Sequence, residues 1–205
     1  MGDILTRFWI VVEEHIKTGD TMPRTYNSNG KDQCRTHLAI NSGLDNLLAP
    51  GGPDFGCILK CLEFGLRTFT SVEIKRDIYR LQQQKFFGTH VWNKGNILLG
   101  DIETVLEEVI QSGKNPYDTI FLDTNCYITD KLLRCVRMSA KLLRGVHEPL
   151  LSVTYTRVAR RKEFAIYPLR PSTITRNTYG WKLITKINYI GVGCTPMTYL
   201  SYKPA

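Results

Sequence analysis

Residues 115–156, NPYDTIFLDTNCYITDKLLRCVRMSAKLLRGVHEPLLSVTYT, contain the pattern that decides the fold. The run YDTIFLD, 117–123, is rich in β-branched and aromatic residues and predicts a strand. The stretch 128–145 has apolar residues at helical spacing and a glycine at its end, which predicts a helix. PLLSVTYT, 149–156, predicts a second strand. A helix between two strands is the usual crossover between parallel neighbours, so the segment is typical of a βαβ unit.

The same alternation extends back to residue 37. The expected strands and helices are, in order, 37–41, 54–64, 67–74, 75–87, 96–102 and 103–113. Regular alternation predicts a parallel sheet with helices on both faces. The chain ends differently, because the expected strands 181–189 and 195–203 are separated only by IGVGC. Only an antiparallel hairpin has so short a connection, so we expect an α/β fold with a seven-stranded, mostly parallel sheet and an antiparallel last strand.

Residues 1–36 differ from the rest. Residues 4–17 have apolar positions at helical spacing, so they predict an amphipathic helix and not a signal peptide. Residues 18–36 are polar and without period, which predicts a long loop. We therefore expect an N-terminal helix and loop over 1–36 and one domain over 37–205. No apolar run approaches the ~18–20 residues that cross a membrane, so no membrane association is expected.

The net charge indicates a class of partner, and the cysteines bear on metal binding and on the redox compartment. The net charge of +8 favours polyanions, nucleic acid first, although many basic proteins bind none. The six cysteines form no CxxC pair and have no histidine at ligand spacing, so we expect no metal site. Scattered single thiols are typical of a reducing cytoplasm.

Three expected strands end in or beside an acid: Glu73, Asp101 and Asp123. Ligands of parallel sheets bind at the carboxyl ends of the strands, and a carboxylate buried there needs a polar partner. Gly51 and Gly52 precede the helix at 54–64, so their backbone N–H groups can approach an anionic or polar ligand. Glu73 follows Gly52 by 21 positions (73 − 52), the spacing at which dinucleotide-binding folds place a ribose-binding acid. We therefore expect Glu73 to accept both ribose hydroxyl protons.

These features together resemble the class I S-adenosylmethionine-dependent methyltransferases. The resemblance covers about residues 37–203, with 115–156 similar to the fourth strand, following helix and fifth strand of that family. It implies a three-layer Rossmann-like fold and S-adenosylmethionine as cofactor. It also implies a role for each matching position. Glu73 would hold the ribose, Asp101 with Ile102 would contact the adenine, the loop from Gly43 to Gly52 would lie near the methionine moiety, and Asp123 would face the transferred methyl group.

The chain departs from the family pattern at two places. The stretch AINSGLDNLLAPGGPDFG, 39–56, is longer than the family's compact glycine loop and lacks a clean GxG. The motif LDTNC, 122–126, lacks the Asn/Asp-Pro-Pro-aromatic signature of methyltransferases that act on base amino groups. Asp123 therefore has several open roles: a general base, a group that fixes the cofactor amine, or an N-cap for the helix that begins near residue 128.

Basic residues form two groups. Arg134, Arg137 and Lys141 recur at helical spacing on the 128–145 helix, opposite an apolar stripe. The run RVARRK follows the fifth strand and adds Arg157, Arg160, Arg161 and Lys162. The aromatic residues that could stack bases beside these groups are Tyr155, Phe164 and Tyr167. A solvated basic face is the alternative to a nucleic-acid surface.

Three functions remain open from the sequence. The first is an S-adenosylmethionine-dependent methyltransferase that acts on nucleic acid. The second is a catalytically inactive protein of the same fold that binds nucleic acid or a protein partner. The third is a small-molecule O-methyltransferase, which would normally need a metal cluster or a closed apolar pocket.

Overall fold

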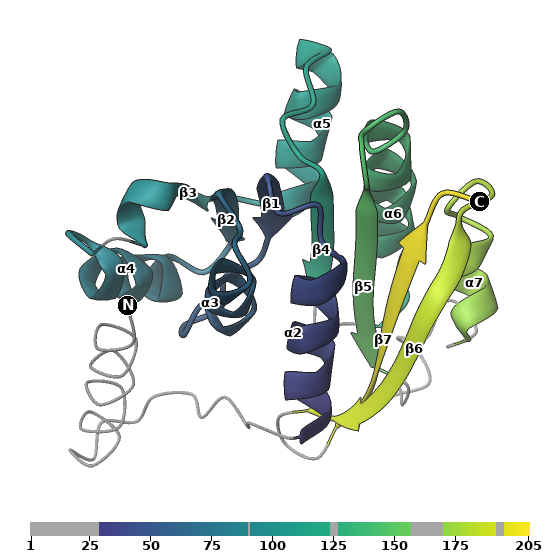
Figure 1. Ribbon diagram of the computed structural model, residues 1–205, viewed down its shortest axis with the longest axis horizontal. Helices are drawn as coiled ribbons and strands as arrows, with labels where there is room; N and C mark the ends of the chain where they lie inside the picture. Colours follow the sequence, from purple (N-terminus) through teal and green to yellow (C-terminus); the bar gives the residue numbers. More distant parts are fainter. Residues whose placement is uncertain (1–28, 90, 124–126, 157–169, 192–194) are drawn as a thin grey trace.

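A computed structural model describes residues 29–89, 91–123, 127–156, 170–191 and 195–205. Within these residues the strands form one seven-stranded sheet in the order β3-β2-β1-β4-β5-β7-β6 (Figure 1). The first five strands pair in parallel, and β7 is antiparallel to both of its neighbours. The expected α/β fold, with its Rossmann-like sheet and antiparallel last strand, is confirmed.

The elements follow the alternation that the sequence indicates from β2 onward. The strands are β1 (Asn46–Ala49), β2 (Thr68–Glu73), β3 (Gly95–Leu99), β4 (Thr119–Asp123), β5 (Leu150–Thr156), β6 (Lys182–Ile190) and β7 (Pro196–Lys203). The helices are α2 (Asn29–Asn41), α3 (Gly56–Glu63), α4 (Arg76–Phe86), α5 (Ile102–Ser112), α6 (Asp130–Leu142) and α7 (Pro171–Thr175), with a 3-10 turn η1 (Trp92–Lys94) before β3.

Two apolar cores lie on opposite faces of the sheet. On one face, α2, α3 and the end of α4 pack against residues such as Leu47, Phe121 and Tyr199. On the other face, α5, α6 and α7 pack against residues such as Ile120 and Val153. Side chains alternate between the faces along each strand, so each buried strand supplies residues to both cores. The three layers, helices, sheet and helices, are those expected for a parallel sheet.

The expected first strand is wrong. Residues 37–41, HLAIN, lie in α2, and the first strand is the four-residue segment Asn46–Ala49. Leu38 and Ala39 are buried against the sheet while Ile40 is 61% exposed, which is the pattern of a helix and not of a strand. The loop expected over 18–36 is also wrong in its second half, because α2 begins at Asn29. The expected division after residue 36 therefore falls inside α2, a helix packed on the sheet.

The correction to the first strand moves the glycine loop. Because β1 ends at Ala49 and α3 begins at Gly56, the loop between them is residues 50–55, directly after the strand. The apparent long connection 39–56 contained the end of α2 and all of β1. The amphipathic helix expected at 4–17 lies outside the described residues. Among the described helices, none combines the length and the apolar character that a membrane span requires.

Candidate functional site

A cavity of about 820 Å³ lies at the carboxyl edge of the sheet. It is lined by residues that follow β1, β2, β3 and β4 and by side chains from α2, α6, β6 and β7. The crossovers leaving β1 and β4, which are adjacent in the sheet, go to helices on opposite faces. This is the switch point at which open α/β sheets bind their ligands, and the volume suits a ligand of nucleoside size.

The glycine loop after β1 forms one wall of the cavity. A Cβ on Gly51 would lie 2.4 Å from Ser71 Oγ and 3.0 Å from Gln82 Nε2, so the loop backbone packs against β2 and α4 too closely for a side chain. Gly52 has a φ of +61°, a conformation that favours glycine. Gln82, which is fully buried, donates a hydrogen bond of 2.6 Å to the Gly52 carbonyl and holds the loop from behind.

Glu73 ends β2 and lines the cavity. Its side chain is 8% exposed, and Oε1 accepts a hydrogen bond of 2.9 Å from the backbone N–H of Lys75. Within the described part of the chain, Oε2 has no hydrogen-bond donor, so the carboxylate keeps acceptor capacity toward the cavity. A buried carboxylate with that capacity suits a ligand that presents hydroxyl groups.

Asp101 follows β3 and caps α5. Its Oδ1 accepts a hydrogen bond of 3.0 Å from the Glu103 N–H, and its Oδ2 pairs with Lys131 of α6. Partial burial alone would raise the pKa of Asp101, but the bonds from Lys131 and Glu103 outweigh it and hold the pKa below its usual value. Asp101 and the neighbouring Ile102 both line the cavity, at the same edge as Glu73.

Asp123 ends β4 and lines the cavity beside the glycine loop. Thr154 of β5 donates a hydrogen bond to its Oδ1. The N-cap of α6 is Thr129, whose side chain accepts from the Leu132 N–H at 3.2 Å. The capping role for Asp123 that the sequence left open is therefore wrong, and its carboxylate remains at the cavity wall.

Four cavity side chains were not predicted from the sequence to belong to the cofactor site: Arg35 and Lys31 on α2, and Tyr189 and Met197 on β6 and β7. Arg35 is only 8% exposed and pairs with Asp54 at 3.5 Å. Burial and the nearby Asp123 raise the pKa of Tyr189, so its hydroxyl stays protonated. The prediction missed Arg35 and Lys31 at this site because the segment that carries them, now part of α2, was expected to be a loop.

The cavity also contains two thiols, Cys57 and Cys135. Burial raises the pKa of Cys57 to about 11 and that of Cys135 to about 12. Both thiols are therefore protonated at neutral pH and are poor nucleophiles. Within the described residues, no group of three or more His, Cys, Asp and Glu side chains is arranged to hold a metal ion.

Gly43 does not belong to this cavity. It precedes β1, where its N–H donates to Thr119 Oγ1 at 3.1 Å and a Cβ would lie 2.7 Å from Asp118 Cγ. Thr119 begins β4, so Gly43 lies at the amino edge of the sheet, opposite the cavity. The expectation that it lies near the ligand is wrong because the first strand begins after Gly43 and not before it.

In the basic stripe on α6, Arg134 and Lys141 are exposed and Arg137 is half-buried. Arg134 Nε pairs with Glu103 at 2.5 Å, and Arg137 donates to Asn177 at 2.7 Å, while Lys141 is exposed. The opposite stripe of α6 is buried as expected. Because Lys131 at the start of α6 lines the cavity, the stripe begins near the cavity and runs toward the other edge of the sheet.

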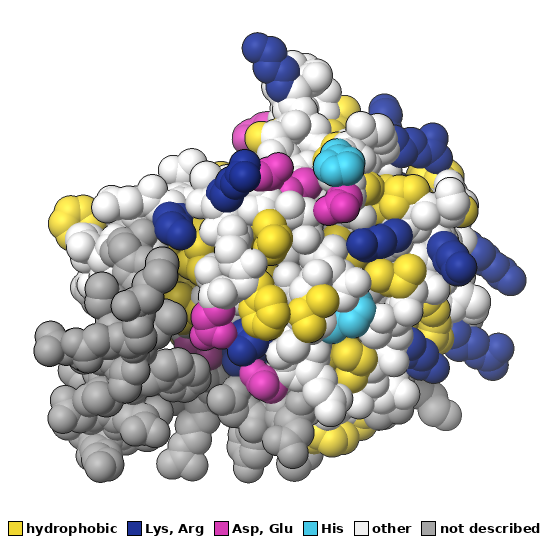
Figure 2. All heavy atoms as spheres, in the orientation of Figure 1, with side chains coloured by type: hydrophobic (Ala, Val, Ile, Leu, Met, Phe, Trp, Pro, Cys, Tyr) yellow, Lys and Arg dark blue, Asp and Glu magenta, His cyan; other side chains and the backbone are white. Residues whose placement is uncertain are grey.

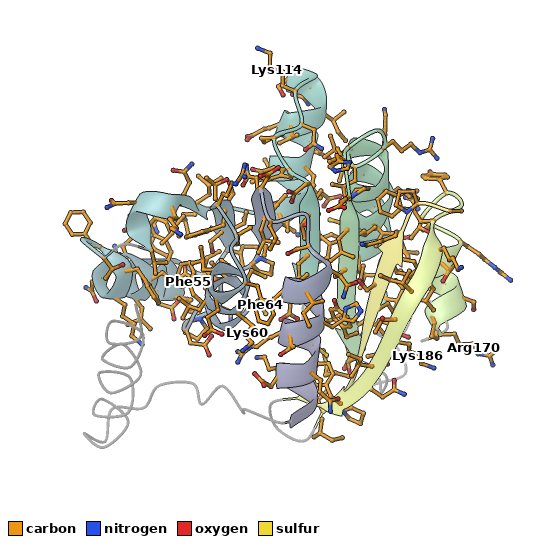
Figure 3. The ribbon with its side chains drawn as sticks, in the orientation of Figure 1. Phe55, Lys60, Phe64, Lys114, Arg170 and Lys186 are labelled. Atoms are coloured by element: carbon orange, nitrogen blue, oxygen red, sulfur yellow. The ribbon has the colours of Figure 1, made fainter. Side chains whose placement is uncertain are left out.

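Outside α6, more basic side chains are exposed on α7 and β6. They are Arg170 and Arg176, which flank α7, and Lys182 and Lys186 on β6. Figure 3 labels Arg170 and Lys186, and Figure 2 shows several Lys and Arg side chains on this side of the molecule. The expected base stacking by Tyr155 is wrong, because this side chain is 1% exposed and belongs to the core under α6. The run 157–162, with Phe164 and Tyr167, lies outside the described residues.

Comparison with known proteins shows which solved structures the chain resembles. No protein-family model matches it, and no curated protein is similar enough in sequence to match. The N-methyltransferase NodS from Bradyrhizobium japonicum WM9 is 14% identical, with a TM-score of 0.62 over 87% of this chain and 99% of that one. The O-methyltransferase from Bacillus cereus, solved in complex with SAH, is 12% identical, with a TM-score of 0.59 over 96% and 90% of the two chains.

A third similar structure is the [4+2]-cyclase SpnF, 9% identical, with a TM-score of 0.61 over 98% of this chain and 93% of that one. The chain therefore has the fold of the class I S-adenosylmethionine-dependent methyltransferases. Since a protein described as a cyclase shares this fold, the fold alone does not fix the activity.

Proposed function

We propose that the chain is an S-adenosylmethionine-dependent methyltransferase. One observation carries the proposal: a single cavity at the switch point of the sheet brings together the loop Gly51–Gly52, the Glu73 carboxylate and Asp123. The cofactor supplies a methyl group bound to a positively charged sulfur. The fold and the bound SAH of the similar O-methyltransferase support the same reading.

The residues of the cavity fit this cofactor. Glu73 keeps an acceptor oxygen toward the cavity and would accept the ribose hydroxyl protons. Ile102, beside Asp101, would contact the adenine, and Gly51 and Gly52 would pass close to the rest of the ligand because no side chain stands there. Asp123, at the opposite side of the glycine loop from Glu73 in the order β2-β1-β4, would lie near the methyl acceptor.

Calorimetric titration with S-adenosylmethionine tests the binding step. We expect the wild type to bind and Glu73→Gln to bind about tenfold or more weakly, because hydrogen bonds to a charged group contribute about 1.5–3 kcal/mol each. Glu63→Gln is the matched control, since Glu63 lies at the end of α3 and pairs with Lys60 outside the cavity. Absence of binding by the wild type would favour the catalytically inactive reading.

Asp123 has two open roles that one variant separates. If Asp123 is the general base, Asp123→Asn should lower the rate of methyl transfer about 10²–10⁴-fold with little change in cofactor affinity. If it fixes the cofactor amine, the same variant should weaken cofactor binding instead. Transfer of a labelled methyl group at saturating cofactor, measured beside calorimetry, distinguishes the two outcomes.

Nucleic acid is the methyl acceptor that we propose. The net charge of +8 and the exposed cations that begin beside the cavity support it. Arg137 and Lys141 on α6 would contact phosphates together with the run Arg157, Arg160, Arg161 and Lys162, which directly follows β5. Arg134 would have to exchange its partner Glu103 for a phosphate to take part.

Filter binding over a salt series tests this acceptor. Each neutralised phosphate contributes about 0.7–0.9 to the slope of log K against log salt, so the double variant Arg160→Ala/Arg161→Ala should flatten the slope by about one to two units. Lys94→Ala/Lys114→Ala removes the same charge from the amino edge of the sheet and should leave the slope unchanged. A wild type without affinity for RNA or DNA at low salt would remove nucleic acid and favour a small-molecule acceptor.

A further inference from the structure

The surface that α6 shares with the loop after α7, the α6–α7 surface, carries positive charge. Both helices pack on the same face of the sheet (Figure 1). Lys141 lies in the last turn of α6, Arg144 follows that helix, and Arg176 follows α7; all three are exposed. The stretches to which these residues belong, 131–147 and 164–205, contain no Asp or Glu. A polyanion therefore meets no like charge from either stretch.

Two hydrogen bonds fix the loop 176–180 against α6. Arg137 donates to Asn177 Oδ1 at 2.7 Å, and Arg144 Nη2 donates to the Tyr179 carbonyl at 3.3 Å. The guanidinium of Arg144 also lies over the Tyr179 ring, 5.8 Å from its centroid, which is the distance of a cation–π contact. These contacts place an aromatic ring within the positive surface.

Tyr179 is exposed and has an unfavourable backbone conformation. It is 55% exposed, and its φ of +52° is in the left-handed region, which bulky residues rarely adopt and glycine adopts freely. Neither burial nor backbone geometry favours a tyrosine at this position. The ring is therefore better explained by contact with a ligand than by the stability of the fold.

We infer that the α6–α7 surface binds single-stranded nucleic acid, with Tyr179 stacking on an unpaired base and the surrounding cations contacting the flanking phosphates. The inference rests on the proposed function, because it adds a second contact to the proposed acceptor. Stacking on an aromatic ring needs a base face that neighbouring bases cover in a duplex, so the ring acts on single strands. Arg144 can donate to a phosphate with the N–H groups that the Tyr179 carbonyl does not use.

The α6–α7 surface lies outside the cavity, but α6 joins the two. Lys131, in the first turn of α6, lines the cavity. Lys141 is ten positions further along the helix (141 − 131), about 15 Å at a rise of about 1.5 Å per residue. A strand anchored at Tyr179 can therefore follow the cations of α6 toward the cavity. The anchor should affect binding of the acceptor and leave cofactor binding unchanged.

Fluorescence anisotropy with three labelled probes, in DNA and RNA form, tests the inference: a short single strand, the same strand without its bases, and a duplex of the same length. The wild type should bind the single strand about fivefold or more tightly than the strand without bases, the effect of one stacked base. Tyr179→Ala should remove this preference and leave the affinity for the other two probes unchanged. Tyr179→Phe, which keeps the ring, should keep the preference.

Phe64→Ala is the matched control for the ring. Phe64 follows α3 on the other face of the sheet, is 42% exposed, and has the ammonium of Lys60 over its ring at 5.6 Å (Figure 3). Removing this second exposed ring with a cation over it should not change the affinity for any of the probes.

The salt dependence separates the ring from the cations. Arg144→Gln should weaken binding of the strands with and without bases, and should flatten the slope of log K against log salt by about 0.7 for one lost phosphate contact. Tyr179→Ala should leave the slope unchanged, because stacking releases no counterion. Lys60→Gln, which removes a cation from α3, should change neither affinity nor slope.

Other outcomes contradict the inference. Wild-type affinity of Tyr179→Ala for the single strand, or equal affinity of the wild type for strands with and without bases, overturns the stacking role and leaves the proposed acceptor standing. A wild type that binds none of the probes overturns the inference and the proposed acceptor, whereas binding of S-adenosylmethionine is decided separately by calorimetry. Binding to vesicles of anionic lipid in place of the probes would assign the surface to a membrane.

A second variant keeps the test valid if Tyr179→Ala does not fold. Tyr179→Gly also removes the ring, and glycine adopts the positive φ of this position without strain. Its thermal unfolding midpoint should not fall below that of the wild type, while the preference for the strand with bases is lost. A Tyr179→Gly variant that folds and keeps this preference overturns the inference.

Discussion

Gly51 is the position where the structure makes the sharpest prediction about the loop that forms the cavity wall. In Gly51→Ala the new Cβ would lie 2.4 Å from Ser71 Oγ, 3.0 Å from Gln82 Nε2 and 3.3 Å from a ring carbon of Phe55. A contact of 2.4 Å cannot be tolerated, so the loop must move away from β2. Overpacking of this kind costs about 1–3 kcal/mol of folding free energy.

The assay is thermal and urea unfolding of Gly51→Ala beside calorimetry with S-adenosylmethionine. For a chain of this size each kcal/mol lowers the midpoint of thermal unfolding by about 2–4 °C. The cofactor affinity should fall as well, because the displaced loop lines the cavity. Gly100→Ala is the matched control: Gly100 also lines the cavity, but a Cβ there would have open space around it. Its stability should stay within about 0.5 kcal/mol of the wild type.

A second substitution identifies the atom responsible. Among the described residues, Ser71 Oγ is buried without a hydrogen-bond partner, so Ser71→Ala should be neutral or stabilising. In the double variant the worst contact is absent, and part of the stability lost in Gly51→Ala should return. Equal stability of Gly51→Ala and the wild type would refute the close packing, and additive effects in the double variant would refute the contact with Ser71.

Three further predictions concern neighbouring groups. Asp101→Ala, which removes the cap of α5 and the pair with Lys131, should lower stability by about 1 kcal/mol in urea unfolding, while Asp101→Asn, which keeps the cap, should lose less. Burial and the charge of Lys203 lower the pKa of His37. The free energy of unfolding should therefore fall as the pH drops below about 6.5, the pKa of histidine in the unfolded chain. A His37→Gln variant that retains this slope would contradict the assignment, and His147→Gln, at an exposed histidine, is the control. Gln82→Leu should weaken cofactor binding more than it destabilises the fold, because it removes the hydrogen bond to the Gly52 carbonyl. If calorimetry shows that the variant binds the cofactor as well as the wild type, the conformation of the loop does not depend on Gln82.

The sequence predicted the fold from β2 onward because each long element carries its own period. α6, for example, buries Leu132, Leu133 and Val136 at helical spacing, and a glycine follows it. Glu73 and Asp123 could be placed at strand ends for the same reason, since β2 and β4 are clear β-branched runs. Whether these acids bind a ligand is a question of chemistry that the periodicity does not address, and it stays a prediction.

The amino-terminal part failed because its signals are short or polar. β1 has only four residues, Asn46–Ala49, and turn-forming residues flank it. It is stabilised by pairing with β2 and β4, and such pairing between distant segments cannot be read from the sequence. α2 buries Cys34, Arg35, Leu38 and Ala39, so half of its contact face is polar or small and its period is weak. HLAIN alone fits a strand or a helix equally well, and tertiary packing on the sheet decided between them.

The two failures had one consequence for function. With a strand at 37–41, the glycines lay far from the strand end and Arg35 lay in a loop outside the domain. With β1 at 46–49, the glycine loop follows the strand directly, and α2 brings Arg35 to the cavity. The fold of this class is compatible with more than one chemistry, since a protein described as a cyclase shares it. The groups expected to distinguish ligands are therefore the charged side chains of α2 and Asp123, because the fold does not require a charge at these positions of the cavity.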